Sequence, residues 1–199
     1  NTGTLVTAPI NQPRLNYSYV NGAWTQPTVL IEPAATNILL NSQDISSWTS
    51  FGNVTVTTDV TTAPDGTTTA DKIAENNVNG EHYAYQGFNN NANGIWTFSC
   101  FAKAAERTSF VVQVEGWTGQ NRTAVLFDLS AGSTIGTAGG TAILNYSIIK
   151  YSNSWYRCIV TFNIAVSNAG LGIICCLSNS TSPSYDGCLL YTSPSPRDQ

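Results

Sequence analysis

Short runs in which apolar and polar residues alternate follow one another along most of the chain, and turn residues separate them. The clearest run spans 95–104. Its apolar positions recur at every second residue and therefore share one face: Trp96, Phe98, Cys100 and Ala102. The run at 155–164 repeats this spacing with Tyr156, Cys158, Val160 and Phe162. No stretch shows the i, i+3, i+4, i+7 spacing of a helix, so the pattern predicts an all-β chain.

About nine such runs at short intervals are typical of two antiparallel sheets packed face to face, a β-sandwich. The strands are expected at 54–58, 69–74, 82–88, 95–104, 110–114, 123–129, 141–151, 155–164 and 171–177, with a shorter one at 14–19. Asn, Gly, Pro and Asp fill the connections between them, as turns require.

The first 27 residues show no sustained periodicity and form an irregular leader. The stretch 28–48 then carries two apolar runs separated by Pro33, which halts regular pairing. We interpret this stretch as a strap that ties the leader to the sandwich. Trp24 and Trp48 are assigned to packing of the leader and the strap. The predicted organisation is a leader at 1–27 and one β module at 28–187.

The charge of the chain excludes some classes of partner. Only 10% of residues are charged, the net charge is −4, and the eight Lys and Arg form no cluster. A nucleic acid or an anionic membrane surface is therefore not an expected partner. No apolar run approaches the ~20 residues that span a bilayer.

The five cysteines lack the paired C-x-x-C spacing of a zinc site. Four of them fall among apolar neighbours inside expected strands: Cys100, Cys158, Cys175 and Cys176. They fit small buried core residues. A Cys100–Cys158 disulfide remains the alternative.

Nothing in the sequence nominates a catalytic centre, and we expect no enzyme. His82 is the only histidine, and no G-x-S-x-G motif is present. Most candidate carboxylates lie in or beside turns, where Asp commonly caps its own backbone: Asp44, Asp59, Asp65, Asp128 and Asp186. Glu115 is the least turn-like, because it lies in a strand on the face opposite Val114.

Five motifs occur in order along the chain: LIEPAATNILLNSQDISSW, APDGTTTADKI, WTFSCFAKA, FDLSAG and SWYRCIVTF. Together they resemble a recurrent module of bacteriophage tail fibres and other virion proteins, and the similarity covers about 14–187. Those modules resemble carbohydrate-binding domains with a jelly-roll, galactose-binding-like fold. Each motif alone is mostly core and turn chemistry, whereas the ordered set is fairly specific.

The resemblance implies a non-catalytic glycan-binding module for host attachment, located in the virion tail or outside the cell. Its partners would be a host-surface polysaccharide and other fibre subunits. Two alternatives stay open: a purely structural fibre spacer or assembly domain, and an accessory module of a secreted glycan-degrading enzyme. No cofactor is expected. A structural calcium ion is the one addition that jelly rolls of this type often hold, but no D-x-D-x-D-G loop is present and no ligand is assigned.

Two departures from the resemblance matter. Ala35 stands where related sequences usually have an arginine, so Glu32 must find another partner. After Gly187 the family continues into a final strand, whereas Cys188 to Asp198 (CLLYTSPSPRD) matches one reading frame of a widely used transposon sequencing adapter. We interpret 188–199 as a non-native tail and expect a jelly roll that lacks its last strand.

A sugar site combines an aromatic face with a few placed polar groups. The loop EGWTGQNR offers Trp117 with Asn121 and Arg122, and a tryptophan among such neighbours has little reason to be core. Further candidates are two pairs on strand faces: Tyr83 with Tyr85, and Trp155 with Arg157. Ordinary sheet-face packing is the competing interpretation for each of them, because aromatic residues are common on half-buried strands.

Overall fold

The computed structural model describes residues 37–89, 94–116, 123–138, 143–164 and 170–176, the segments 181–182, 184–186 and 191–195, and the pairs 15–16, 19–20, 23–24 and 28–29. The four pairs are short strands: β1 (Leu15–Asn16), β2 (Tyr19–Val20), β3 (Ala23–Trp24) and β4 (Thr28–Val29). β1 pairs with β4 and β2 with β3. The strand expected at 14–19 is therefore two separate elements within the described residues.

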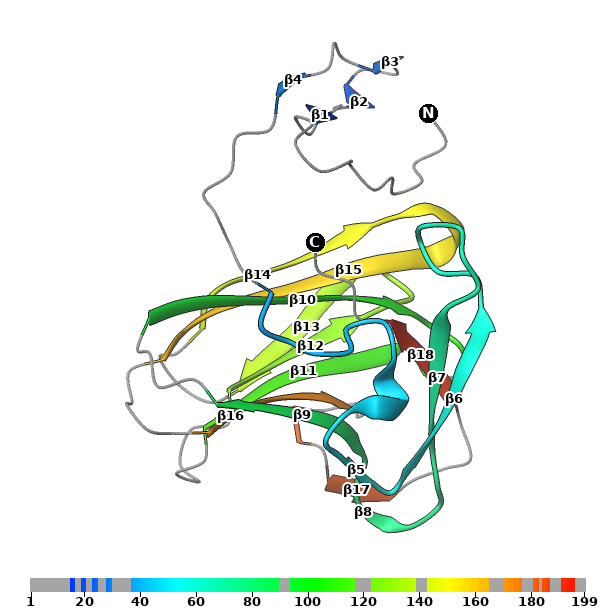
Figure 1. Ribbon diagram of the computed structural model, residues 1–199, viewed down its shortest axis with the longest axis vertical. Helices are drawn as coiled ribbons and strands as arrows, with labels where there is room; N and C mark the ends of the chain where they lie inside the picture. Colours follow the sequence, from blue (N-terminus) through cyan, green and yellow to red (C-terminus); the bar gives the residue numbers. More distant parts are fainter. Residues whose placement is uncertain are drawn as a thin grey trace.

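The rest of the described chain forms two antiparallel sheets of six strands, which face each other in Figure 1. The first sheet has the order β14 (Ile143–Lys150), β15 (Trp155–Ile164), β10 (Gly94–Lys103), β18 (Tyr191–Ser195), β7 (Ala70–Glu75) and β6 (Val54–Thr61). The second sheet has the order β13 (Ser133–Ala138), β12 (Thr123–Asp128), β11 (Ser109–Gly116), β16 (Gly170–Cys176), β9 (Tyr83–Asn89) and β5 (Ser50–Gly52). β8 (Asn79–Glu81) pairs with β17 (Ser184–Asp186) outside both sheets.

The chain passes back and forth between the two sheets, since β7, β10 and β15 of the first sheet alternate along the sequence with β9, β11 and β16 of the second. This alternation suits a jelly roll, in which antiparallel strands of two sheets enclose one core. The predicted all-β, two-sheet antiparallel sandwich is confirmed.

The core lies between the sheets and is built from the alternating faces that the sequence predicts. Phe98, Cys100 and Ala102 of β10 are buried in it, together with Tyr156, Cys158, Val160 and Phe162 of β15. The second sheet contributes Phe110, Val112, Val114, Ala84, Val125 and Phe127. Because side chains of a strand alternate between faces, these buried positions also fix which residues face outward.

The two cysteines of the first sheet lie directly opposite each other, Cys100 on β10 and Cys158 on β15. Both are fully buried in the core. Their burial agrees with the interpretation as small core residues. The side chains of the remaining three cysteines lie outside the described residues.

The second half of the predicted strap packs into the core of the sandwich. A 3-10 turn, η1 (Ile45–Ser47), carries Ile45 into the core, and Trp48 follows it there with 4% of its surface exposed. The packing role predicted for Trp48 is confirmed. Trp24 lies in β3, and its side chain falls outside the described part, as do Glu32 and Ala35.

The C-terminal region differs from the expectation. We interpreted 188–199 as a non-native tail and expected a jelly roll that lacks its last strand, whereas Tyr191–Ser195 forms β18 between β10 and β7. Pairing is brief: three residues of β18 face β10, and two face β7. Without a strand here, β10 and β7 would each leave a row of backbone groups unpaired in the middle of a sheet. An extended segment satisfies part of that row even though Pro194, opposite Ala102, has no N–H to donate.

The sequence pattern also missed β13. Its residues, STIGTA, are separated from the preceding strand only by a short turn that Asp128 caps. A register shift between Leu126 and Phe127 breaks the simple alternation. Thr and Gly in place of apolar residues leave little periodic signal at a sheet edge.

Candidate functional site

Two tyrosines lie side by side on the outer face of the second sheet. Ala84 of β9 points into the core, so its neighbours Tyr83 and Tyr85 point away from it. The register places Tyr85 in line with Gln113 and Ala124 across β16, β11 and β12. Tyr83 lies in line with Val111 and Leu126.

Both tyrosine rings lie against glycine backbone. A Cβ atom added to Gly52 of β5 would meet the Tyr83 ring, with Cδ1 at 2.8 Å. A Cβ atom at Gly87 would lie 2.9 Å from the Tyr85 hydroxyl and 3.3 Å from its Cε1. Real Cβ atoms do not tolerate contacts this close, so the two glycines are what allow the rings to lie along the sheet.

An apolar floor supports the pair. Val111, Ala124 and Leu126 form a buried cluster on this outer face, and the half-buried Tyr83 and Tyr85 pack against it. A ring held on one side by packed residues presents its remaining surface in a fixed orientation. We call this assembly of the two tyrosines and the three residues beneath them the tyrosine platform.

Gln113 lies beside the tyrosine platform and is the unusual polar residue of this face. It is 1% exposed, and neither its Oε1 nor its Nε2 makes a hydrogen bond within the described part of the chain. A buried amide that lacks partners costs free energy, about 1–3 kcal/mol. Such groups are rare in folded proteins and call for an explanation. The sequence carries a signal for it, an amide between Val112 and Val114 in an expected strand, which sequence reasoning missed.

The first group of predicted ligand residues, Trp117, Asn121 and Arg122, lies outside the described residues. The residue that precedes this segment is described, since β11 ends at Gly116. Gly116 pairs with Leu171 of β16, and Leu171 pairs with Phe88 of β9. The segment thus begins at the end of the second sheet that also carries Gly87, against which Tyr85 lies. The side chain of Glu115 is likewise outside the described part.

The third predicted pair belongs to the first sheet, so the structure does not bring it together with the tyrosines. Trp155 lies on the outward face, as expected, but Ala63, Ala70 and Phe101 cover it. It is 1% exposed, and its Nε1 donates a hydrogen bond to the Thr62 carbonyl at 3.0 Å. This corrects the expectation that Trp155 offers its ring to a ligand, because the loop after β6 folds over it.

Arg157 is engaged within the first sheet. Its Nε and Nη2 donate to the Ser99 hydroxyl at 3.1 and 2.8 Å, and its guanidinium carbon lies 6.0 Å from the centre of the Phe101 ring. Ser99 itself is buried at 2% exposure. These contacts give Arg157 a structural role in the described chain and leave its predicted ligand role a prediction.

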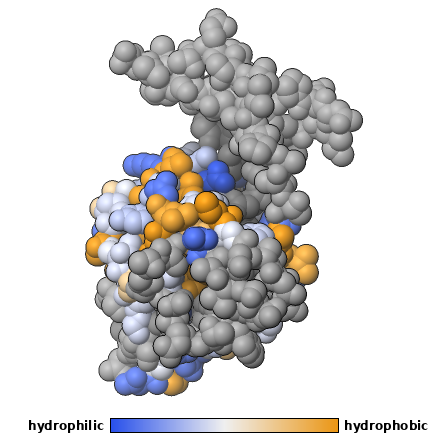
Figure 2. All heavy atoms as spheres, turned by 90° about the vertical axis from the view of Figure 1, so that its left-hand side faces the viewer, coloured by the Kyte–Doolittle hydropathy of each residue, from blue (hydrophilic) through white to orange (hydrophobic). Residues whose placement is uncertain are grey.

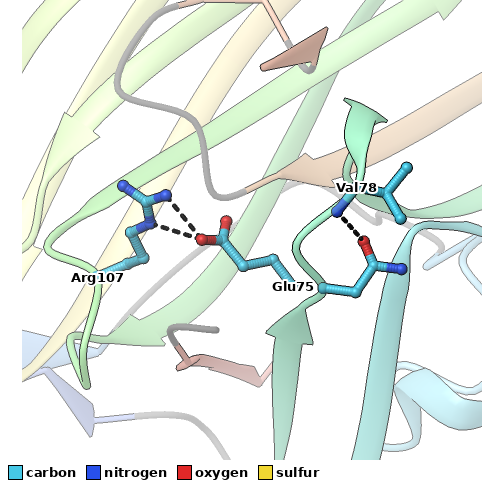
Figure 3. Close-up of polar contacts among 4 residues, drawn as sticks. Glu75, Val78 and Arg107 are labelled. Carbon is cyan, nitrogen blue, oxygen red and sulfur yellow. Dashed lines mark hydrogen bonds and ion pairs between the residues drawn. The ribbon is translucent and has the colours of Figure 1, made fainter. Parts of the chain in front are cut away.

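Two buried carboxylates on β7 are tied to neighbouring segments, and sequence reasoning did not single them out. Glu75 accepts hydrogen bonds from Nε and Nη2 of Arg107 at 3.2 and 2.7 Å (Figure 3). Asp71 accepts from the backbone N–H groups of Ile45 at 2.6 Å and Asp59 at 3.2 Å. Burial raises the pKa of Asp71, and these two hydrogen bonds oppose the rise. Each carboxylate therefore connects β7 to another segment of the chain through hydrogen bonds.

Other carboxylates cap turns, as predicted. Asp128 accepts from the N–H groups of Ser130 and Ala131 and from the Ser130 hydroxyl, which lowers its pKa. Asp65 caps the N–H of Thr67. Just past Glu75, the N–H of Val78 donates to the Asn76 side chain at 3.1 Å and closes a further turn, also drawn in Figure 3.

Residues of the types that bind metal ions do not gather in the described ranges. No group of three or more His, Cys, Asp or Glu there is placed to hold a metal ion. His82 is fully buried. Among the described elements, none is a helix of the length and apolar character needed to cross a membrane.

No protein-family model matches the chain, and no curated protein matches it significantly.

Proposed function

We propose that this chain is a non-catalytic glycan-binding module of a phage tail fibre or related virion protein, and that the tyrosine platform is its sugar-contacting surface. The observation that carries the proposal is the pair of rings held against Gly52 and Gly87 on an outward sheet face. A pyranose ring has an apolar face that stacks on such a surface, while its hydroxyls need hydrogen-bonding partners at the edges.

The polar partners come from two places. Gln113 lies in the same row as Tyr85, and its amide is a donor and an acceptor that make no hydrogen bond within the described residues. A sugar hydroxyl would supply the missing bonds. Because the amide is covered in the unliganded chain, binding through it requires the covering side chains to move aside. The segment with Trp117, Asn121 and Arg122 begins at the adjacent end of the sheet and adds further groups.

A glycan array probed with the chain 1–199 tests the proposal. Tyr85→Ala removes the ring and is expected to lower affinity about tenfold, the magnitude of one aromatic contact. Tyr85→Phe keeps the ring and should bind within a few-fold of the parent. Equal loss in both variants, with unchanged folding by circular dichroism, would contradict stacking as the source of affinity.

Gln113→Leu separates binding from stability. Replacing an unpartnered amide with an apolar residue of similar volume should raise the free energy of unfolding, by about 1–3 kcal/mol. The same change should weaken glycan binding, because the ligand loses its donor and acceptor. A variant that is more stable and binds equally well would remove Gln113 from the site.

A structural fibre module is the second candidate, favoured by the unprotected edge strand described below. Under that function, the array stays silent for the parent and for all variants, while self-association is retained. Trp117→Ala tests the loop that follows β11 on the same glycan array. If the chain binds glycan through this loop, the variant should bind the glycan more weakly than the parent.

A further inference from the structure

The four strands at the ends of the two sheets are protected to different degrees. An edge strand presents unpaired N–H and C=O groups, and proteins commonly shorten it, bulge it, charge it or cover it. Of the described edges, β5 has three residues, and β13 has six and meets a register shift in its neighbour β12. β6 is interrupted between Thr57 and Thr61, where Asp59 has a φ of +58°.

β14 lacks such protective features, namely a short length, a bulge or several charges, over most of its length. It has eight residues, pairs among the described strands only with β15, and is irregular in that pairing only between Ile143 and Asn145. From Asn145 to Lys150 its register is continuous, and Lys150 is its one charged residue. A regular, nearly uncharged edge of this length is a template for another strand.

Apolar side chains of β14 are exposed on both of its faces. Leu144 is 51% exposed, Tyr146 41% and Ile149 45%. Figure 2 shows hydrophobic residues gathered in the upper part of the described surface, the level at which β14, β15 and β10 lie in Figure 1. Tyr146 lies opposite Val160 on the core-facing side, whereas Ile149 lies opposite Arg157 on the outer side.

We infer that β14 pairs with β14 of a second copy of this chain, antiparallel about a twofold axis at Ser147, so that the two first sheets become one continuous sheet. In this register Tyr146 faces Ile148 of the partner subunit, and Asn145 faces Ile149 of the partner subunit. Lys150 faces Leu144 of the partner subunit, so the two like charges stay apart.

The register follows from the faces of the strand. Side chains alternate with a period of two, so only a pairing that joins odd with odd positions keeps core-facing residues of both copies on one side. A twofold axis at Ser147 meets this condition, places Tyr146 against Ile148 of the partner subunit on the core-facing side, and keeps the two Lys150 side chains apart. A second copy is the occupant that satisfies the whole edge with one self-complementary surface.

Sedimentation equilibrium of the chain 1–199 over about 1–100 µM tests the pairing, a range that brackets the affinities of weak symmetric dimers. The parent is expected to rise from 21.3 kDa toward twice that mass. In the double variant Asn145→Lys, Ile149→Lys, each substituted position faces the other one on the partner subunit. Two pairs of like charges then oppose each other across the axis, and the variant should be a monomer. Asn145→Glu with Ile149→Lys places opposite charges at the same two contacts, and should restore the dimer.

Ile95→Lys is the control for loss of an exposed isoleucine, since Ile95 is 70% exposed on β10 and away from the β14 edge. It should dimerise like the parent. Circular dichroism and thermal melting confirm that each variant folds. A parent that is monomeric throughout, a dimer that survives the two lysines, or failure of the Glu–Lys variant to reassociate overturns the inference. Because the readout is mass, the result is independent of whether the tyrosine platform binds glycan, although a dimer would present two platforms and gain avidity.

Discussion

The two halves of the first sheet are held together by different kinds of interaction. Strand β10 pairs with β15 through ten consecutive residues, and β15 continues the ladder to β14. On its other side β10 reaches the β6–β7 hairpin only through β18, with three residue pairs on one edge and two on the other. Continuous backbone hydrogen bonding therefore joins β10, β15 and β14, whereas the β6–β7 hairpin depends more on side-chain contacts for its position in the sheet.

The side chains that replace the ladder connect strands of this sheet with neighbouring loops and turns. Glu75 of β7 binds Arg107 of the β10–β11 connection, and Asp71 binds the backbone of η1. Trp155 at the start of β15 bonds Thr62 just after β6. Ala63, Ala70, Phe101 and Trp155 pack together on the outer face. Where a sheet lacks continuous pairing, buried polar ties and a small apolar cluster hold its position, and single substitutions should then have large effects.

The ion pair between Glu75 and Arg107 should give the largest effect. Glu75→Ala removes the carboxylate that binds the guanidinium of a mostly buried arginine, and is expected to lower the free energy of unfolding by about 3–5 kcal/mol in urea denaturation. The half-exposed pair Lys72–Glu106, at 3.3 Å, is the matched control, and Lys72→Ala should cost less than about 1 kcal/mol. Equal effects would show that the pair does not hold the hairpin.

Trp155→Phe tests the tie between β15 and the loop after β6. The phenyl ring keeps most of the apolar contact but loses the donor to Thr62, and we expect a loss of about 1–2 kcal/mol. The comparison is Tyr156→Phe on the ladder side, whose ring faces the core. If Trp155→Phe lowers the free energy of unfolding by less than Tyr156→Phe does, the hydrogen bond from Trp155 to Thr62 does not contribute to stability.

Pro194→Val addresses β18 itself. Valine restores an N–H and suits a strand, so if Tyr191–Ser195 fills the sheet between β10 and β7, stability should rise by about 1 kcal/mol. The measurement is the urea midpoint at unchanged m-value. An unchanged or lower midpoint would show that these residues contribute no strand in solution.

The pH dependence that Asp71 gives to the stability of the protein is the smallest effect we expect from the contacts of the β6–β7 hairpin. Its pKa is raised above the usual 3.8 by burial, so the folded state holds its proton more tightly than the unfolded state. Its contribution to stability is therefore complete below 3.8 and is lost as the pH rises through the folded pKa. The stability difference between the parent and Asp71→Asn should be largest in acid and should shrink toward neutral pH. A difference that grows with pH would reverse the assignment.

Part of the candidate site could be predicted from the sequence. Tyr83 and Tyr85 were expected on one strand face, and they lie together on the outer face of the second sheet. Gln113 was missed because the row that it shares with Tyr85 runs through β16 to β9, and both strands are far from it in the sequence. Trp155 was assigned to the correct face, but only the path of the loop after β6 shows that this face is covered.

The sequence by itself determined the all-β class, the positions of the long strands and the residues that form the core, because alternation with period two is a local property of a strand. Tertiary structure decided which strands are neighbours, which outward faces are covered, and what lies between β10 and β7. Those outcomes depend on backbone hydrogen bonds and loop paths between distant segments. The last of them, β18, depends on where unpaired backbone groups remain rather than on any pattern in its own five residues.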